Sequence, residues 1–186
     1  FEAVNYGKLE QMGFPMANID QLGAALVRLA DESIATEADI FSMATRMAAT
    51  GGLTGFTATE ILSLSAAFAS MGVEAEAGGS AASKLMKKMQ LAAETGENVE
   101  GFANVMGVSA DEFTQMWDSS AADTMLSFFQ GLSDLDASGT QSVTAWLDEM
   151  ELNEIRLSNL IALGASRPDM FESLMGSGAA AFAENT

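Results

Sequence analysis

Carboxylates dominate the side chains that could do chemistry in this chain. It has 26 acidic and 8 basic residues, with no histidine and no cysteine. The lack of histidine removes the usual general base and any Ser-His or Cys-His nucleophile. The lack of cysteine removes disulfides, thiol nucleophiles and thiolate metal sites. What remains is carboxylate chemistry, either calcium binding or hydrolysis by paired acids.

The segment Asp134–Gly139 is the best candidate for a metal site. It has acidic or hydroxyl residues at loop positions 1, 3 and 5 and glycine at position 6, as in an EF-hand. The motif then fails, because Gln141 stands where an apolar residue belongs and Ala145 stands where a bidentate Glu is required. We therefore assign no metal ligands and interpret the segment as a solvated loop between helices.

Neighbouring carboxylates occur at Asp111 with Glu112 and at Asp148 with Glu149 and Glu151. Paired carboxylates can hydrolyse glycosides, but they need an enclosing cleft and one raised pKa. Acidic helix termini explain these pairs equally well, since negative charge favours the first turn of a helix. We assign no catalytic residue and no cofactor-binding residue.

Gly78 and Gly79 interrupt an otherwise helical stretch that continues into Lys84, Lys87 and Lys88. A phosphate-binding loop would need a preceding strand and a closer lysine. Two structural interpretations remain: a helix that begins here, or, as we favour, a close approach of a neighbouring helix. The lysines are interpreted as solvated, with an acidic partner as the alternative.

The net charge of −18 limits the partners of this chain. Such a surface repels phosphate backbones and anionic headgroups, so we expect neither nucleic-acid nor membrane binding. No segment approaches 18 uninterrupted apolar residues, which favours a soluble protein. Because the chain begins at Phe1, we expect it to be a piece of a longer protein.

Composition and punctuation predict an all-α fold. Hydrophobic residues make up 48% of the chain, while β-favouring residues are sparse. Capping-box spacing marks three helix starts, at Thr36/Asp39, Thr57/Glu60 and Ser109/Glu112. Glycine followed by an apolar residue marks three stops, at Gly51-Gly52-Leu53, Gly72-Val73 and Gly107-Val108.

These signals predict a compact irregular bundle of about eight to ten short helices, preceded by an entry arm or linker at 1–17. The core domain is 18–186. The apolar faces include Ile61, Leu64 and Phe68, and later Ile155, Leu157 and Leu160. The punctuation recurs irregularly, which excludes a solenoid. The predicted helices are 18–32, 37–50, 58–71, 75–94, 97–106, 110–117, 120–134, 141–150, 154–165 and 168–175.

An ordered set of phrases resembles a known family. These are TEADI at 36–40, MATRM at 43–47, EILSL at 60–64, SMGVEAEAGGSA at 70–81, FANVMGVSADEF at 102–113, FFQGL at 128–132 and EIRL at 154–157. The run resembles the conserved core of tape measure proteins from long-tailed phages and prophages, of the lactococcal-phage type, over residues 19–182. One departure is Leu29-Ala30-Asp31-Glu32, where the family has a Leu-Gly-Asn-Asn-like turn.

The resemblance implies a virion structural component inside the tail tube or at the tail tip, assembled in the bacterial cytoplasm and without enzymatic activity. It implies partners among tail tube, tail-tip or baseplate proteins and tail assembly chaperones, with self-association in few copies. We expect a folded anchoring or checkpoint module on the ruler rather than the extended rod. The alternatives are a generic acidic helical protein-protein interaction module and, third, an acid-pair glycosidase.

Overall fold

The computed structural model describes residues 18–185, and this part of the chain is a compact all-helical bundle, 81% helical and without strands. The predicted entry arm at 1–17 lies outside the described residues. The ten described helices are α2 (Ile19–Asp31), α3 (Glu37–Leu53), α4 (Ala58–Ser70), α5 (Ala75–Thr95), α6 (Val99–Met106), α7 (Ala110–Ser119), α8 (Ala121–Ala137), α9 (Val143–Glu149), α10 (Ile155–Ser166) and α11 (Pro168–Glu184).

Local capping explains where most of these helices begin. Thr36 with Asp39 and Ser109 with Glu112 form complete capping boxes, with a bond in each direction. At Thr57 the box is half formed: the Glu60 N–H donates to the Thr57 hydroxyl at 3.2 Å, and the return bond is not made. The predicted starts are therefore confirmed, two of them with complete capping boxes.

Two of the three predicted stops are also confirmed. Gly72 and Gly107 adopt left-handed backbone conformations, with φ of 81° and 70°. The following N–H groups of Val73 and Val108 donate to carbonyls five residues back, as in a Schellman motif. Both valine side chains pack against the core, which closes each helix end.

The stop predicted at Gly51 is wrong, because α3 continues to Leu53 and the left-handed residue is Gly55, at φ 92°. Gly51 is buried where α4 crosses, and a Cβ there would lie 2.6 Å from Ile61 Cδ1. Gly51 thus allows α3 and α4 to pack closely and does not end α3. Leu53, the apolar residue that follows Gly51 and Gly52, is 84% exposed.

The last helix is longer than the predicted 168–175 and runs to Glu184. Gly178, beyond the predicted end, lies at the crossing with α4. A Cβ there would lie 2.4 Å from the Ser63 hydroxyl oxygen. Packing against α2 and α4 keeps this stretch helical despite its low intrinsic propensity.

Gly78 and Gly79 lie inside α5, so the helix does not begin at them. A Cβ at Gly79 would lie 2.5 Å from Arg46 Cβ, and one at Gly78 would lie 2.9 Å from Met43 Cε. The two glycines therefore let α3 and α5 approach closely, as we favoured from the sequence. The face predicted for α10 needs one correction, since Ile155 is 71% exposed on the side opposite to Leu157.

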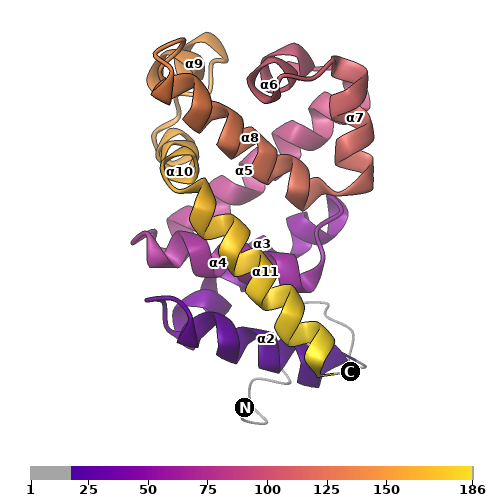
Figure 1. The fold of residues 1–186 in the computed structure, drawn as a ribbon, viewed down its shortest axis with the longest axis vertical. Coiled ribbons are helices and arrows are strands. Elements are labelled where there is room, and N and C mark those ends of the chain that lie inside the picture. Colours follow the sequence, from indigo (N-terminus) through magenta and orange to yellow (C-terminus); the bar gives the residue numbers. More distant parts are fainter. Residues whose placement is uncertain (1–17, 186) are drawn as a thin grey trace.

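The helices form two ends joined by a shared middle (Figure 1). The helices α2, α3 and α4 gather at one end, and α6 to α9 gather at the other. The helix α5 runs between the ends and contacts α3 as well as α6, α7 and α10. The helix α11 runs from the middle of the molecule across α4 to α2. The last described helix therefore packs against the first described helix.

We predict that Gly131→Ala destabilises the protein by roughly 1–3 kcal/mol, because the new methyl group would overpack a tight helix crossing. Its Cβ would lie 2.3 Å from the Val105 carbonyl oxygen, a backbone atom that cannot swing aside. Urea unfolding followed by circular dichroism measures the change.

The matched control is Gly176→Ala, at a helical position where a Cβ meets nothing within 4 Å. This change should stabilise by about 0.5–1 kcal/mol, because alanine loses less backbone entropy. Equal effects of the two substitutions would contradict the described crossing of α6 and α8.

Candidate functional site

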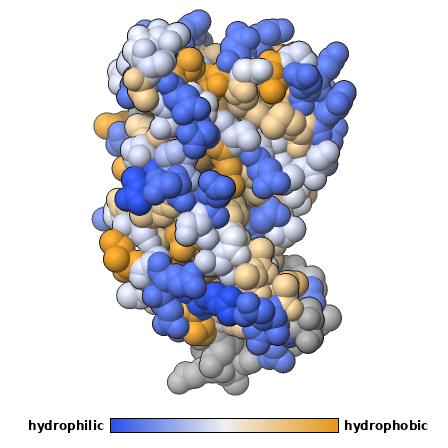
Figure 2. Space-filling model, viewed as in Figure 1, coloured by the Kyte–Doolittle hydropathy of each residue, from blue (hydrophilic) through white to orange (hydrophobic). Residues whose placement is uncertain are grey.

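Hydrophilic residues cover much of the face shown in Figure 2, with small hydrophobic patches between them. Three ion pairs occur in residues 18–185: Arg28 with Glu184, Lys84 with Glu154 at 3.4 Å, and Arg167 with Asp169 at 3.0 Å. All three are substantially exposed, so each contributes little to stability. The predicted lysine cluster is exposed at all three positions, with Lys84 paired to the residue that caps α10.

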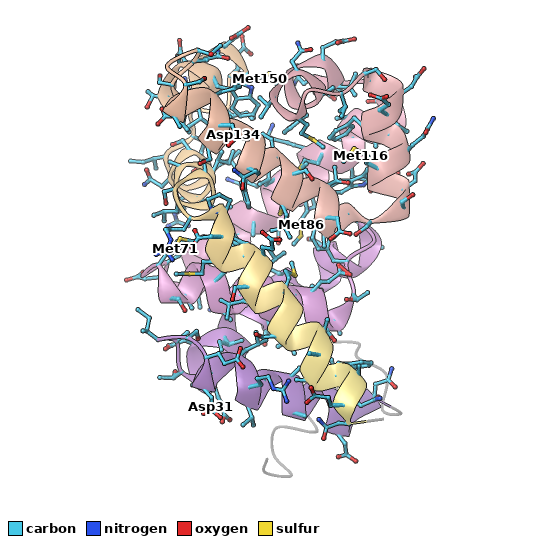
Figure 3. The ribbon with its side chains drawn as sticks, in the orientation of Figure 1. Asp31, Met71, Met86, Met116, Asp134 and Met150 are labelled. Carbon is cyan, nitrogen blue, oxygen red and sulfur yellow. The ribbon has the colours of Figure 1, made fainter. Side chains whose placement is uncertain are left out.

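The EF-hand-like segment is not a loop at its start. Asp134 and Asp136 lie on the last turn of α8, where Figure 3 labels Asp134. Their carboxylates accept hydrogen bonds from Gln130 Nε2, at 2.9 Å, and from the Val143 N–H, at 3.4 Å. Among residues 18–185, no group of three or more acidic side chains is placed to hold a metal ion.

The neighbouring carboxylates of the sequence serve local structure. Glu112 completes the cap of α7, and Glu149 accepts a hydrogen bond from Gln141 Nε2 at 2.7 Å. Asp111, Asp148 and Glu151 are exposed. These side chains lie at the ends of α7 and α9. Asp111 lines an open groove of about 400 Å³ between α5, α6 and α7, where no second carboxylate is found among the described lining residues.

Glu60 is the one carboxylate among residues 18–185 that is not largely exposed to solvent. The sequence identified it only as a capping residue. Its side chain is half-buried, and its Oε2 atom is fully buried without a hydrogen-bond partner. Burial raises the pKa of the Glu60 carboxyl, contact with Thr57 offsets part of the rise, and the charge of Asp123 adds to it. A carboxylate in such a place is stabilised by any cation that can reach it.

Glu60 lies in a groove of about 470 Å³ between α2, the start of α4 and the second half of α11. The lining is mostly apolar, and Glu60 is the only charged residue among the described residues that form it. It consists of Asn18, Leu22, Thr57, Ala58, Thr59, Glu60, Ser63, Met175, Ala179 and Phe182. A groove of this size and character suits an apolar segment that carries one positive charge. Within residues 18–185 no second carboxylate lines it, so these residues do not form the two-acid geometry of glycoside hydrolysis there.

No protein-family model, curated protein or solved structure matches this chain. Among the described residues, no helix is both long enough and apolar enough to cross a membrane. The main features of the described residues are thus the acidic exterior, the packed helices and the groove beside Glu60.

We predict that salt stabilises this protein. The net charge of −18 causes self-repulsion in the folded state, whereas few exposed ion pairs stand to be weakened by screening. Raising NaCl from about 20 to 300 mM should stabilise by about 1 kcal/mol and raise Tm by roughly 2–4 °C.

Thermal unfolding monitored by circular dichroism provides the measurement. The variant Lys87→Glu, which adds charge at an exposed helical site, should show a larger salt effect than wild type. A fall of Tm with salt would mean that the ion pairs outweigh the repulsion.

Proposed function

We propose that this chain is a module of a tape measure protein from a tailed phage or prophage, and that it acts in tail assembly and tail-length determination. The support is the ordered set of sequence phrases between residues 36 and 157, which resemble the core region of that family. The phrases fall on helices and helix junctions of one continuous bundle, as expected for a single folded unit.

The proposed role is anchoring or checkpoint rather than ruler. A helix advances about 1.5 Å per residue, so residues 19–182 would span about 250 Å as one rod. The longest described helix, α5, has 21 residues and spans only about 32 Å. These residues therefore form a compact bundle instead of a long rod. A compact shape suits attachment to other tail components.

We propose that the module works without catalysis. The chain has no histidine or cysteine, and its neighbouring carboxylates are used at helix ends. Its partners would be tail tube, tail-tip or baseplate proteins and assembly chaperones, with self-association in few copies. The acidic exterior disfavours direct contact with nucleic acid or anionic membranes.

The second candidate is a generic acidic protein-protein interaction module. The observation that favours it is the apolar groove beside Glu60, which could serve any helical adaptor. The two candidates differ in whether loss of the domain alters tails.

The test is tail length by electron microscopy after in-frame deletion of residues 19–182 from the encoding phage or prophage. We expect aborted tails, or tails of scattered length, with the mutant protein still present. Uniform shortening by about 250 Å would instead assign the segment to the measuring rod. Unchanged tails with full infectivity would leave the interaction module as the function.

A second experiment keeps chain length constant. We expect Gly131→Ala, which disturbs the crossing of α6 and α8, to make tail assembly temperature-sensitive, while Gly176→Ala does not. If the segment were an extended rod, neither substitution should change tail length or assembly, because neither changes the number of residues.

A further inference from the structure

Basic residues of this acidic protein gather on two helices that pack together. Among residues 18–185, α5 and α10 are the only helices with more basic than acidic residues, and they contact each other. The three lysines of α5, Lys84, Lys87 and Lys88, are spaced so that they share one exposed face of the helix. Within the described part of the chain, neither Lys87 nor Lys88 takes part in an ion pair. A cationic face, which we call the lysine face, is therefore exposed on a molecule whose net charge is −18.

A small, mostly apolar pocket lies at one end of the lysine face, among α5, α6 and the loop 150–154 between α9 and α10. Its volume is about 30 Å³, and Lys88 and Leu91 line it from α5. Phe102 and Leu152 line it as well and are themselves almost fully buried, whereas Leu91 is 42% exposed. Because one water needs about 10–15 Å³ of such volume, the pocket accepts about two groups of that size, such as the branched end of a leucine side chain.

The wall of the pocket has backbone geometry that non-glycine residues seldom adopt. Among residues 18–185, the non-glycine residues with positive φ are Asn98, at 58°, and Glu151, at 57°. Asn98 lines the pocket, and Glu151 stands between two further lining residues, Leu152 and Met150, the latter labelled in Figure 3. The Leu152 N–H donates to the Leu147 carbonyl at 2.8 Å, which fixes the turn at the end of α9. The pocket is therefore preformed, since the surrounding packing holds both turns in the left-handed conformation.

Charge complementarity favours an acidic segment as the occupant of this surface. Each of the other described helices carries more acidic than basic residues, so those helices repel such a segment and direct it to the lysine face. Glu97 is the acidic residue of the described lining, so the carboxylates of the segment belong on the α5 side and only an apolar side chain enters the pocket. A second copy of the chain is a poorer occupant, because two molecules of charge −18 repel each other.

We propose that the lysine face and its pocket bind an acidic peptide segment of another protein. The carboxylates of the segment pair with Lys87 and Lys88, and a leucine-like side chain enters the pocket beside Leu91. The ion pairs speed association and set the orientation, while burial of the apolar side chain supplies most of the affinity. An extended peptide of about eight residues spans about 26 Å, which covers the rise of about 10 Å from Lys84 to Leu91. This inference does not depend on the phage assignment.

The test is selection from a yeast-displayed library of random peptides of about eight residues, with the full chain as the target at low salt. We expect the enriched peptides to be acidic and to contain one large aliphatic residue. Their enrichment should be lost when the target is the double variant Lys87→Glu/Lys88→Glu, which reverses the charge of the lysine face. Failure to enrich acidic peptides, or equal enrichment on the two targets, would overturn the proposal.

Fluorescence polarisation with the most enriched peptide measures the two parts of the site separately. Lys88→Gln should weaken binding about threefold, as expected for the loss of one exposed ion pair. Leu91→Glu places a charge at the pocket and should weaken binding at least about tenfold. The matched control is Ile34→Glu, which makes the same kind of change at an exposed apolar residue outside the pocket and should stay within about twofold of wild type. Equal losses for Leu91→Glu and Ile34→Glu would contradict the assignment to this pocket.

Two further measurements separate binding from folding and from self-association. Every variant should keep the helix content and the cooperative circular dichroism melt of wild type, because the substituted residues are exposed. The mass measured by light scattering should be the same for wild type and for Lys87→Glu/Lys88→Glu. A dimer of wild type that the double variant abolishes would assign the lysine face to a second copy of the chain and overturn the peptide proposal.

Discussion

The bundle depends on a continuous series of aromatic contacts centred on two adjacent residues of α8, Phe128 and Phe129. Phe128 faces Phe102 at 5.4 Å and Trp146 at 5.2 Å, measured between ring centroids, at one end of the molecule. Phe129 faces Phe171 at 5.2 Å, and Phe171 in turn lies 4.9 Å from Phe68. Because adjacent helical residues point about 100° apart, one helix thus ties the two ends together.

This arrangement requires other positions to be small. Gly164 of α10 lies against the Phe129 ring, where a Cβ would approach to 2.5 Å, and Gly131 lies against the backbone of α6. Methionine fills much of the rest, with Met43, Met47, Met86, Met89 and Met125 fully buried. Large rings, bare glycines and adaptable methionines together allow short helices to pack at irregular angles.

The exterior is charged and solvated, whereas the core is apolar. Acidic residues outnumber basic ones at the surface, and the few ion pairs are solvated, so stability comes from burial rather than from charge pairing. The exception is Glu60, a half-buried carboxylate at the edge of an apolar groove. Among the described residues, this apolar groove interrupts an otherwise acidic and polar exterior.

Local signals in the sequence determined most helix positions. Capping residues such as Thr36 and Ser109, and left-handed glycines such as Gly72, act within one helical turn and need no distant partner. Tertiary structure alone decided that α3 continues past Gly51 and α11 past Gly178, because those glycines meet other helices. It also decided the groove, since Leu22, Glu60 and Phe182 are far apart in the chain and acquire a shared environment only when α11 packs across α2 and α4.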